Sequence, residues 1–405
     1  MKQTRQSEKL EDRSQKSEVL SYESGVLSID THNSELKTRN SELRTQNSEL
    51  NNSSPLILDM TKLNNLNCGL GQISLNFANE LINQYDKIQK FSIYFLVKPN
   101  QKEVWNSSPI VKTIKTNWFR RFFSVFNRNE GIWHSIHQDS KFLPRKNSKY
   151  ILTIHDLNFL ESNDKKKIDR NIRILQKKVN RASAVCFISN YVKDIASKNL
   201  NLEGKDLQVI YNGLPCQAAS QKPNIKIGDK KFLFNIGVLM PKKNHESIIK
   251  MMAHLPDYNL IIAGGGKTSY KNQLIKTAEG SGVSDRVHFV GIISDAEKTW
   301  YYQNAEAFVF PSLAEGFGLP VIEAMNAGLP VFCSDKTSLP EIGSDKAFYF
   351  SNFDPEQMAK LVTTKLNDNN VKSEEFKNNL ISYSENFSWH NNVDRYIDIY
   401  KNMIK

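Results

Sequence analysis

The amino-acid sequence predicts an α/β protein with two doubly wound, mainly parallel sheets in tandem. The chain has 405 residues, more than a single hydrophobic core usually supports. Two series of short apolar segments alternate with amphipathic segments, which is the pattern of parallel β-α-β units. A polar stretch without periodicity, residues 217–230, separates the two series and indicates a linker. Two such sheets are expected to bind a ligand in a cleft between their carboxyl ends.

The pattern divides the chain into five segments. We expect a polar tail (1–53), a Rossmann-like N-terminal domain (54–216), the linker (217–230), a second Rossmann-like domain (231–385) and a C-terminal helix (386–405). In the tail, Asn-Ser-Glu-Leu recurs at positions 33, 40 and 47, which gives one leucine per heptad. A stable coiled coil needs apolar residues at two heptad positions, so we expect a disordered or partly helical tail; an oligomerising coil is the alternative.

Apolar runs bounded by turn residues predict the strands, and 3.6-residue periodicity predicts the helices between them. In the N-terminal part the expected strands are 56–60, 91–97, 150–155, 184–188 and 207–211, and the clearest helices are 70–84, 164–182 and 190–198. In the C-terminal part the expected strands are 231–236, 258–263, 287–290, 307–311, 330–334 and 347–350, again with helices between them.

Composition excludes several classes of protein. With 39% hydrophobic residues and no long apolar run, the sequence predicts no transmembrane helix. The first residues are polar throughout, so we expect no secretory signal and a cytoplasmic protein. The four cysteines, at positions 68, 186, 216 and 333, lack metal-ligand spacing and are expected to be reduced thiols.

The net charge of +11 is concentrated in residues 98–149 and 161–181. Such basic clusters indicate an anionic partner or simply a solvated face. Within the first cluster, segments 117–123 and 133–139 set aromatic rings beside arginines or histidines. That combination suits a sugar or a membrane surface, and a packed helix is the alternative.

The most informative segment, residues 311–330, follows an expected strand and runs into a helix. Pro320 suits the first helical turn, where a missing N–H costs nothing. Glycines between Glu315 and Pro320 let the backbone approach a ligand, and the amides at a helix N-terminus can bind phosphate or a sugar hydroxyl. Glu315 lies before the helix and Glu323 inside it, so the two carboxylates can contact separate ligand groups.

This segment closely resembles the E-x7-E motif of the retaining GT-B glycosyltransferases, the family 4-like proteins of glycosyl transferases group 1. Glu315 and Glu323 match the two glutamates of the motif. The resemblance implies the GT-B fold, with two Rossmann-like domains facing across a cleft and a last helix that crosses back to the N-terminal domain. It further implies that Glu323 binds ribose hydroxyls and that Glu315 holds the donor sugar. The donor-binding residues implied in this segment are Gly316, Phe317, Gly318, Leu319 and Glu323.

Residues 236–244 resemble the family's strand-to-helix turn that ends in a basic pair and an asparagine. When a nucleotide sugar loses its nucleoside diphosphate, negative charge grows on the distal phosphate, and a positioned cation stabilises it. We assign Lys243 to this charge, so the expected catalytic residues are Glu315, Lys243 and His155. Many relatives have Arg where this sequence has Val238 or Lys242, and a lysine cannot form the same bidentate contact. The donor-binding residues implied here are Gly237, Lys242, Lys243 and Asn244.

Further glycines and His155 lie where the chain leaves an expected strand. Gly264 and Gly265 resemble the family's turn beneath the nucleotide, and Gly69 and Gly71 resemble its glycine loop facing the donor phosphates. His155 resembles the family's histidine near donor sugar and acceptor. A core or capping histidine is the alternative for this residue.

The resemblance implies a retaining glycosyltransferase that moves a hexose-type sugar onto a saccharide or lipid-linked saccharide in surface polysaccharide or glycoconjugate biosynthesis. Because the sequence contains no Asp-x-Asp pair, we expect a metal-independent enzyme with no metal site and no cofactor. The expected partners are a nucleotide sugar, the acceptor and an anionic membrane at its inner face, but no nucleic acid.

Three other interpretations of the sequence remain open at this point. A GT-B sugar phosphorylase or nucleotide-sugar epimerase would share the cleft but not the transfer. A non-catalytic saccharide-binding scaffold would keep the fold with a decayed site. A nicotinamide oxidoreductase is disfavoured because the glycine loops lack the full G-x-G-x-x-G spacing.

Overall fold

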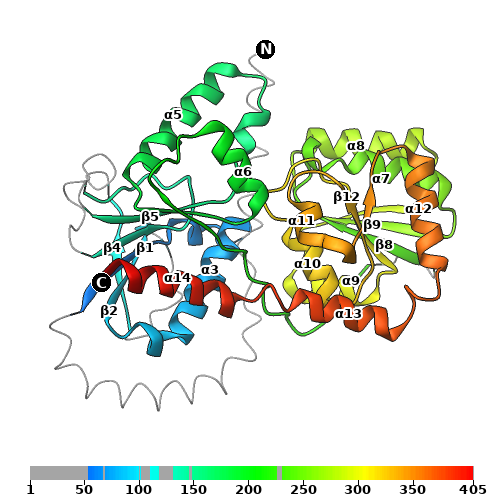
Figure 1. Cartoon of the computed structure of the whole chain (residues 1–405). Coiled ribbons are helices and arrows are strands. Elements are labelled where there is room, and N and C mark those ends of the chain that lie inside the picture. The colour runs from blue at the N-terminus through cyan, green and yellow to red at the C-terminus, as the bar shows by residue number, and fades with distance from the viewer. Residues whose placement is uncertain are drawn as a thin grey trace. The chain divides into compact units, whose positions relative to one another are not determined.

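The computed structural model describes residues 53–66, 69–99, 101, 110–117, 131–145, 148–225 and 230–404. The heptad tail lies outside these residues apart from its last residue, and so do Cys68 and segment 118–123. Two parallel sheets dominate the described part, and helices lie on both faces of each (Figure 1). The expected α/β class with two Rossmann-like domains is therefore confirmed.

The first sheet has seven strands in the order β3-β2-β1-β4-β5-β6-β7, and every pairing is parallel. Its strands are β1 (Ser54–Asp59), β2 (Phe91–Val97), β3 (Val111–Lys115), β4 (Ile132–Ser135), β5 (Lys149–Ile154), β6 (Ala184–Phe187) and β7 (Asp206–Val209). Sequence patterns did not predict β3 or the central strand β4. The polar residues His134 and Ser135 interrupt the apolar run of β4, yet both are fully buried.

The second sheet has six strands in the order β10-β9-β8-β11-β12-β13, and again all pairs are parallel. Its strands are β8 (Lys231–Ile236), β9 (Tyr258–Ala263), β10 (Val287–Gly291), β11 (Ala307–Phe310), β12 (Val331–Ser334) and β13 (Phe348–Phe350). All six correspond to expected strands. Their residues are almost wholly apolar because helices cover both faces of the sheet.

The helices alternate with the strands along the chain. They are α3 (Gly69–Asn83), α5 (Lys165–Arg181), α6 (Asn190–Asn199), α7 (His245–Met251), α8 (Thr268–Gly280), α9 (Asp295–Asn304), α10 (Leu319–Asn326), α11 (Leu339–Gly343), α12 (Pro355–Asn367), α13 (Glu374–Ser384) and α14 (Trp389–Ile404). Short 3-10 helices are η3 (Thr61–Asn64), η4 (Tyr85–Ile88), η6 (Asn158–Glu161), η7 (Pro241–Lys243), η8 (Met252–His254) and η9 (Ser344–Lys346). Within the described residues, no helix combines the length and apolar character that a membrane crossing requires.

Strand order reverses once in each sheet, beside β1 in the first and beside β8 in the second. From β1 the chain continues to β2 on one side, whereas β4 is added on the other side; β8, β9 and β11 repeat this arrangement. We call these positions the first and second switch points. The loops that leave the carboxyl ends of the strands diverge there, which is where open parallel sheets bind ligands.

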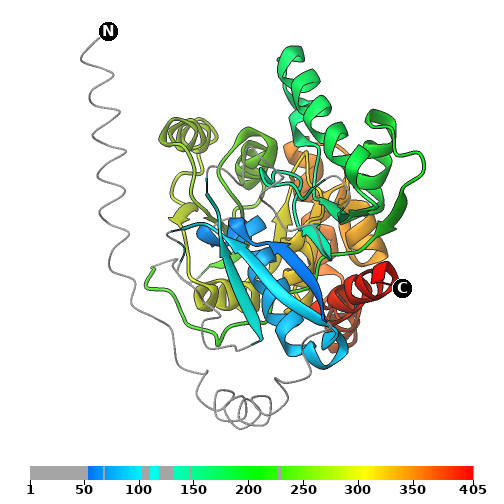
Figure 2. The ribbon, with the colours of Figure 1, turned by 90° about the vertical axis from the view of Figure 1, so that its left-hand side faces the viewer.

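Helix α14 packs on the first sheet although it follows the second sheet in sequence. Val393, Tyr396 and Tyr400 belong to the apolar core formed by β1, β2 and α3, and α14 lies beside α3 in both views (Figures 1 and 2). His134 connects the helix to the sheet: its Nδ1 lies 2.7 Å from the Tyr400 hydroxyl and its Nε2 lies 2.9 Å from Thr153 Oγ1. Both ring nitrogens of this buried histidine are therefore satisfied.

Candidate active site

An ion pair joins two loops at the second switch point. The loop after β8 contains η7, and the loop after β11 leads into α10. The Lys243 ammonium contacts Glu315 Oε1, and the two side chains are 15% and 14% exposed. Lys243 Nζ also lies 5.0 Å from the centre of the Phe310 ring. One cation and one carboxylate, both largely shielded from water, thus lie at the edge of the sheet where ligands bind.

Glycines allow the loops after β8 and β9 to cross closely. Gly264 has a φ of +134°, and a Cβ at this position would lie 1.9 Å from the carbonyl oxygen of Gly237. The Gly265 carbonyl accepts a hydrogen bond of 2.8 Å from the Leu239 amide. Asn244 then turns the chain into α7 in the left-handed region, with a φ of 53°. Only glycine meets both the steric and the torsional demand at 264.

Hydrogen bonds hold the loop that presents Glu315. The Leu313 amide donates to the Lys242 carbonyl at 2.8 Å, which ties this loop to η7. The Glu315 amide donates to Thr337 Oγ1 at 3.1 Å, and the Ser338 hydroxyl donates to the Glu315 carbonyl at 3.1 Å. The backbone on either side of the carboxylate is therefore fixed, which predisposes the side chain to one position.

The residues after Glu315 contribute backbone rather than side chains to the site. Gly318, with a φ of +104°, is the N-cap of α10, and Leu319 begins the helix. The Phe317 side chain is only 4% exposed, and its ring lies 6.0 Å from the rings of both Tyr211 and Phe387. Any contact of Phe317 with a ligand would therefore involve its main chain.

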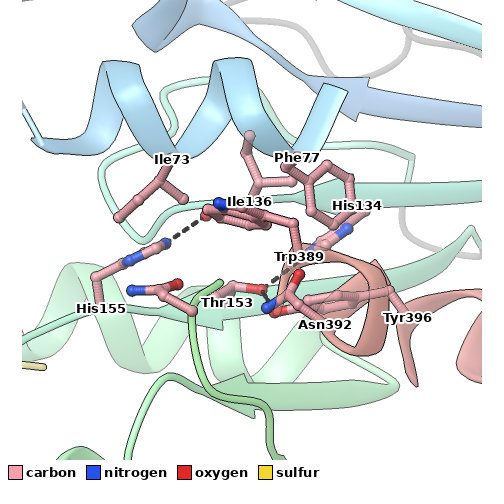
Figure 3. Close-up of a pocket in the computed structure, with 10 residues that line it drawn as sticks. Ile73, Phe77, His134, Ile136, Thr153, His155, Trp389, Asn392 and Tyr396 are labelled. Carbon is pink, nitrogen blue, oxygen red and sulfur yellow. Dashed lines mark hydrogen bonds between the residues drawn. The ribbon is translucent and has the colours of Figure 1, made fainter. Parts of the chain in front are cut away.

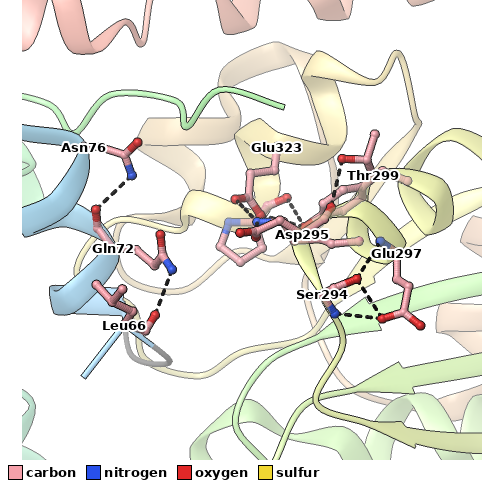
Figure 4. A network of polar contacts seen from close by, with 11 residues as sticks. Leu66, Gln72, Asn76, Ser294, Asp295, Glu297, Thr299 and Glu323 are labelled. Carbon is pink, nitrogen blue, oxygen red and sulfur yellow. Dashed lines mark hydrogen bonds and ion pairs between the residues drawn. The ribbon is translucent and has the colours of Figure 1, made fainter. Parts of the chain in front are cut away.

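Glu323, inside α10, is held by two residues of α9. Lys298 Nζ lies 3.0 Å from Glu323 Oε1, and the Tyr302 hydroxyl donates to Oε2 at 3.0 Å. Figure 4 shows Glu323 of α10 beside Asp295 of α9. Lys298 also pairs with Asp295 at 3.1 Å. Although burial lowers the pKa of Lys298, the two carboxylates raise it above its ordinary value, so the ammonium stays charged. The Glu323 carboxylate is thus oriented before any ligand binds.

Sequence reasoning did not find Lys298 and Tyr302. The pair Ser294 and Glu297 forms a capping box that begins α9, and a spacing of four residues puts Lys298 and Tyr302 on one face of that helix. This signal could have predicted the shared face. It could not have predicted that α10 packs against that face.

The first sheet reaches the site through His155, which follows β5. The ring Nε2 lies 2.7 Å from the Ile136 carbonyl, and the His155 amide donates to Gln138 Oε1 at 3.0 Å. A Cβ on Gly316 would lie 2.0 Å from the His155 carbonyl oxygen, so only glycine permits this approach. The Ser189 hydroxyl donates to the Gly316 carbonyl at 2.8 Å. His155 and the loop that contains Glu315 are therefore brought together.

A second contact between elements of the two sheets involves Glu341 of α11. Its carboxylate accepts hydrogen bonds from the amides of Asn190 at 2.6 Å and Tyr191 at 2.9 Å, and from the Tyr211 hydroxyl at 2.9 Å. A carboxylate at the N-terminus of α6 is favourable because the helix dipole and the free amides point at it. Sequence analysis gave no signal for this contact.

Gly69 and Gly71 lie at the start of α3. A Cβ on Gly71 would lie 1.9 Å from the Asn65 carbonyl oxygen, whereas the space around Gly69 is open. Close packing of the loop before α3 accounts for Gly71 by itself. No described contact joins either glycine to Lys243 or Glu315.

Buried polar groups gather at the first switch point. Asp59 ends β1; its carboxylate accepts a 2.9 Å hydrogen bond from the Thr61 amide and contacts the Ser140 hydroxyl. Lys178 donates to the Ser140 carbonyl at 2.7 Å. His137, which follows β4, is 1% exposed, and neither ring nitrogen has a hydrogen-bond partner among the described residues.

The fold and the site define the class of protein. A solved structure of sucrose-phosphate synthase from Thermosynechococcus elongatus superposes with a TM-score of 0.68 over 87% of this chain and 99% of that chain, at 17% identity. The chain thus has the GT-B glycosyltransferase fold.

Sequence comparison finds similarity to one family in the C-terminal part of the chain. Residues 217–400 match the family described as glycosyl transferases group 1. The chain is 25% identical over 285 residues to O-antigen chain mannosyltransferase B of Escherichia coli, which covers 65% of this chain and 73% of that protein. It is 34% identical over 177 residues to O-antigen chain mannosyltransferase RfbU of Salmonella typhimurium, which covers 44% of this chain and 49% of that protein. This chain therefore spans about half the length of the second relative.

The buried histidines of the first sheet predict an acid-sensitive fold. Burial lowers the pKa of His134 to about 3 and that of His137 to about 4, and it also lowers the pKa of His155. In the unfolded chain these rings protonate near their ordinary pKa of about 6.5, so the unfolded state binds more protons below that pH. The contribution of these neutral, buried histidines to the free energy of unfolding is expected to be complete above about pH 6.5. It should fall as the pH drops towards 4.

His137→Gln should flatten this dependence in urea-unfolding midpoints measured between about pH 4 and 7. The control His254→Gln removes an exposed histidine instead of a buried one. Equal slopes in the wild type and in His137→Gln would contradict the prediction.

Proposed function

We propose that this protein transfers a hexose-type sugar from a nucleotide-diphosphate sugar to a saccharide or lipid-linked saccharide, with retention of anomeric configuration. The observation that carries the proposal is the shielded Lys243–Glu315 ion pair at the second switch point, with Glu323 oriented on the adjoining helix α10. The relatives named as O-antigen mannosyltransferases support surface polysaccharide assembly as the setting.

Lys243 is the cation for the leaving diphosphate. As the bond from the anomeric carbon to the diphosphate breaks, negative charge develops on the distal phosphate, and a pre-positioned ammonium in a shielded site stabilises it. Without ligand, Glu315 neutralises Lys243 and keeps a lone charge from being buried. When the donor binds, its phosphate replaces Glu315 as the partner of Lys243, and Glu315 becomes free to accept a sugar hydroxyl.

Glu323 fits the role of ribose ligand because its two oxygens are already directed by Lys298 and Tyr302. A carboxylate with spare lone pairs accepts hydrogen bonds from vicinal hydroxyls. Lys298 and Tyr302 act through Glu323 and are positioning residues. They hold the carboxylate in one orientation.

For the transfer step, the acceptor oxygen bonds to the anomeric carbon on the face from which the diphosphate leaves, and the acceptor proton passes to the departing phosphate. No side chain forms a covalent bond to the sugar. His155, Lys243 and Glu315 bind and orient the reacting groups. Because Lys243 supplies the positive charge, the reaction is proposed to need no metal. Within the described ranges, no group of three or more His, Cys, Asp or Glu side chains could hold one.

Slow donor hydrolysis is the first expected activity. One member of a panel of UDP-, GDP- and ADP-sugars should release nucleoside diphosphate, and Lys243→Ala should lower that rate about a hundredfold because charge stabilisation is lost. Glu315→Ala should lower the rate as well, because the donor sugar loses the carboxylate that accepts its hydroxyl. Glu323→Ala and Lys298→Gln should mainly weaken donor binding, by about tenfold, as measured by calorimetry. The control is Glu374→Ala, because this glutamate is 79% exposed and pairs with Lys377 of the same helix.

Each contrary outcome has a distinct meaning. If Glu374→Ala reduced the rate as much as Glu315→Ala, the losses would reflect folding rather than the site. Conversion of the donor sugar without any acceptor would instead identify an epimerase, and cleavage that requires phosphate would identify a phosphorylase. If the protein bound no member of the panel, the proposed function would be wrong.

Stereochemistry and metal dependence can be read from one reaction. The anomeric proton of the product is expected to show the donor's configuration by NMR, and the rate is expected to be unchanged after treatment with EDTA because Lys243 takes the place of a metal ion. An inverted anomer would overturn the retaining mechanism. Loss of turnover with chelator, restored by magnesium or manganese, would overturn metal independence.

Contact with an anionic membrane at the cytoplasmic face is proposed for helix α5. Lys165, Lys166, Lys167 and Arg170 are exposed on this helix, and Ile174, one turn further on, is 49% exposed. Exposed cations beside an apolar side chain suit an anionic lipid surface. We expect the protein to float with vesicles that contain anionic lipid at low salt, and the Lys165→Glu/Lys166→Glu/Lys167→Glu triple variant to float less. Equal flotation with neutral vesicles would contradict an electrostatic contact.

A further inference from the structure

A side chain continues the contact between β4 and β5 beyond the point where the two strands stop pairing. Main-chain pairing ends at Ser135 and Leu152. Gln138 Oε1 then accepts a hydrogen bond of 3.0 Å from the His155 amide, and Gln138 Nε2 donates to the Asp156 carbonyl at 3.1 Å. The Gln138 amide therefore offers this backbone the same donor and acceptor that a neighbouring strand would offer.

The His155 ring is held by the same loop, residues 136–140, which we call the loop after β4. Nε2 of the ring lies 2.7 Å from the Ile136 carbonyl and so carries the ring proton, and Figure 3 shows the ring directed at this carbonyl. The ring also lines a small cavity with Trp389 and Asn392, which has room for about one water molecule. Within the described residues Nδ1 has no hydrogen-bond partner. The polar contacts that hold the ring and the amide of His155 thus come from the loop after β4.

Lys178 of α5 fixes this loop from its other side. Its side chain is largely buried, and its ammonium contacts the Gln138 carbonyl and donates to the Ser140 carbonyl at 2.7 Å. Burial lowers the pKa of Lys178, whereas Asp139 and Asp59 act in the opposite direction. Hydrogen bonds from a charged donor are stronger than those between neutral groups, so Lys178 restrains the main chain on which the Gln138 side chain depends.

The segment that Gln138 holds lies directly against the loop of the proposed donor site. A Cβ on Gly316 would lie 2.0 Å from the His155 carbonyl oxygen and 3.3 Å from Asp156 Cβ. Gly316 follows Glu315, which pairs with Lys243. A displacement of about 1 Å in an active site can lower a rate about a hundredfold, so the position of this backbone matters for the reaction.

We propose that Gln138 is a positioning residue for the sugar transfer, and that Lys178 supports it by fixing the loop after β4. Gln138 acts through the backbone of His155 and Asp156, whose position against Gly316 it sets. The inference rests on the proposed function and adds to it a residue that the first sheet contributes from outside the reacting groups.

The first test compares turnover with donor binding. Gln138→Met keeps the length of the side chain and loses both hydrogen bonds to the backbone. We expect kcat for donor hydrolysis to fall about tenfold. The KM for the donor should change less than about twofold, because Glu323 and the second sheet are proposed to hold the nucleotide.

Gln176→Met is the matched control. Gln176 makes the same kind of contact with Asn201: its Nε2 donates to the Asn201 carbonyl at 2.9 Å, and its Oε1 accepts from the Asn201 amide at 2.8 Å. Both glutamines are half-buried, but Asn201 follows the C-terminus of α6, whereas Ser189 and Gly316 meet at its N-terminus. The two variants should lower the urea-unfolding midpoint by similar amounts, and Gln176→Met should leave kcat unchanged. Equal losses of kcat would refute a specific role of Gln138.

A second test does not depend on turnover. It follows the ring N–H signals of the protein labelled with ¹⁵N at its 8 histidines, and the His155 signal is assigned by its absence in His155→Gln. The buried Nε2 proton should give a signal in the wild type and in Gln176→Met. In Gln138→Met this signal should shift or be lost through exchange with water, because the ring follows the backbone that Gln138 holds.

The role of Lys178 is tested by coupling. Lys178→Met is expected to lower kcat through the same loop, so the losses in Lys178→Met and Gln138→Met should be less than additive in the double variant. Urea unfolding of each variant checks that the protein is folded under the assay conditions. Fully additive losses would show that Lys178 acts independently of Gln138.

Failure of this inference can be told apart from failure of the proposed function. If Gln138→Met hydrolyses the donor as fast as the wild type does, the positioning role is wrong and the proposed function stands. If the wild type neither binds nor hydrolyses any donor, the proposed function is wrong, and the His155 signal still decides whether Gln138 holds this residue. An unchanged His155 signal in Gln138→Met would refute the inference in either case.

Discussion

The constraint on which the structure depends is the single reversal of strand order in each parallel sheet. At these switch points the loops that leave the strands diverge, so side chains of different loops can meet at the carboxyl edge of the sheet. The loops after β8 and β11 meet at one of them and bring Lys243 to Glu315. The loops after β1 and β4 leave the other, where Asp59 and His137 lie buried. Both groups of shielded polar side chains therefore lie where the strand order reverses.

The Lys243–Glu315 ion pair at the second switch point is expected to add little to the stability of the fold. A largely shielded ion pair gives little net stabilisation, because desolvation offsets most of the attraction between its members. Removing one partner is costly, however, unless another charge takes its place. In the proposed function, a phosphate would replace Glu315 as the partner of Lys243, and a sugar hydroxyl would replace Lys243 as the partner of Glu315. Glu323 differs: Lys298 and Tyr302 hold it while its remaining lone pairs stay available.

Contacts between elements of the two sheets include main-chain groups and small or polar side chains. Gly316 admits the His155 carbonyl, Ser189 bonds to Gly316, and Glu341 caps α6. Such contacts are directional, so they define the geometry in which the two parts meet. Apolar contacts add to them. Phe317, Ile322 and Ile342 belong to one core cluster with residues of β5 and β6, and α14 packs into the core of the first sheet.

The sequence by itself determined the fold class, all six strands of the second sheet and the segment that holds Glu315 and Glu323. These features are local: apolar runs, glycines and a proline act within a few residues of one another. Strand β4 was not predicted, because His134 and Ser135 are polar and only Tyr400, Thr153 and Tyr150, distant in sequence, make their burial possible. Tertiary structure alone decided that Lys243 meets Glu315, that Lys298 meets Glu323 and that Trp389 and Asn392 share a pocket with His155. Each of these pairs is joined by packing between separate elements, and side-chain periodicity contains no information about which faces of two elements will meet.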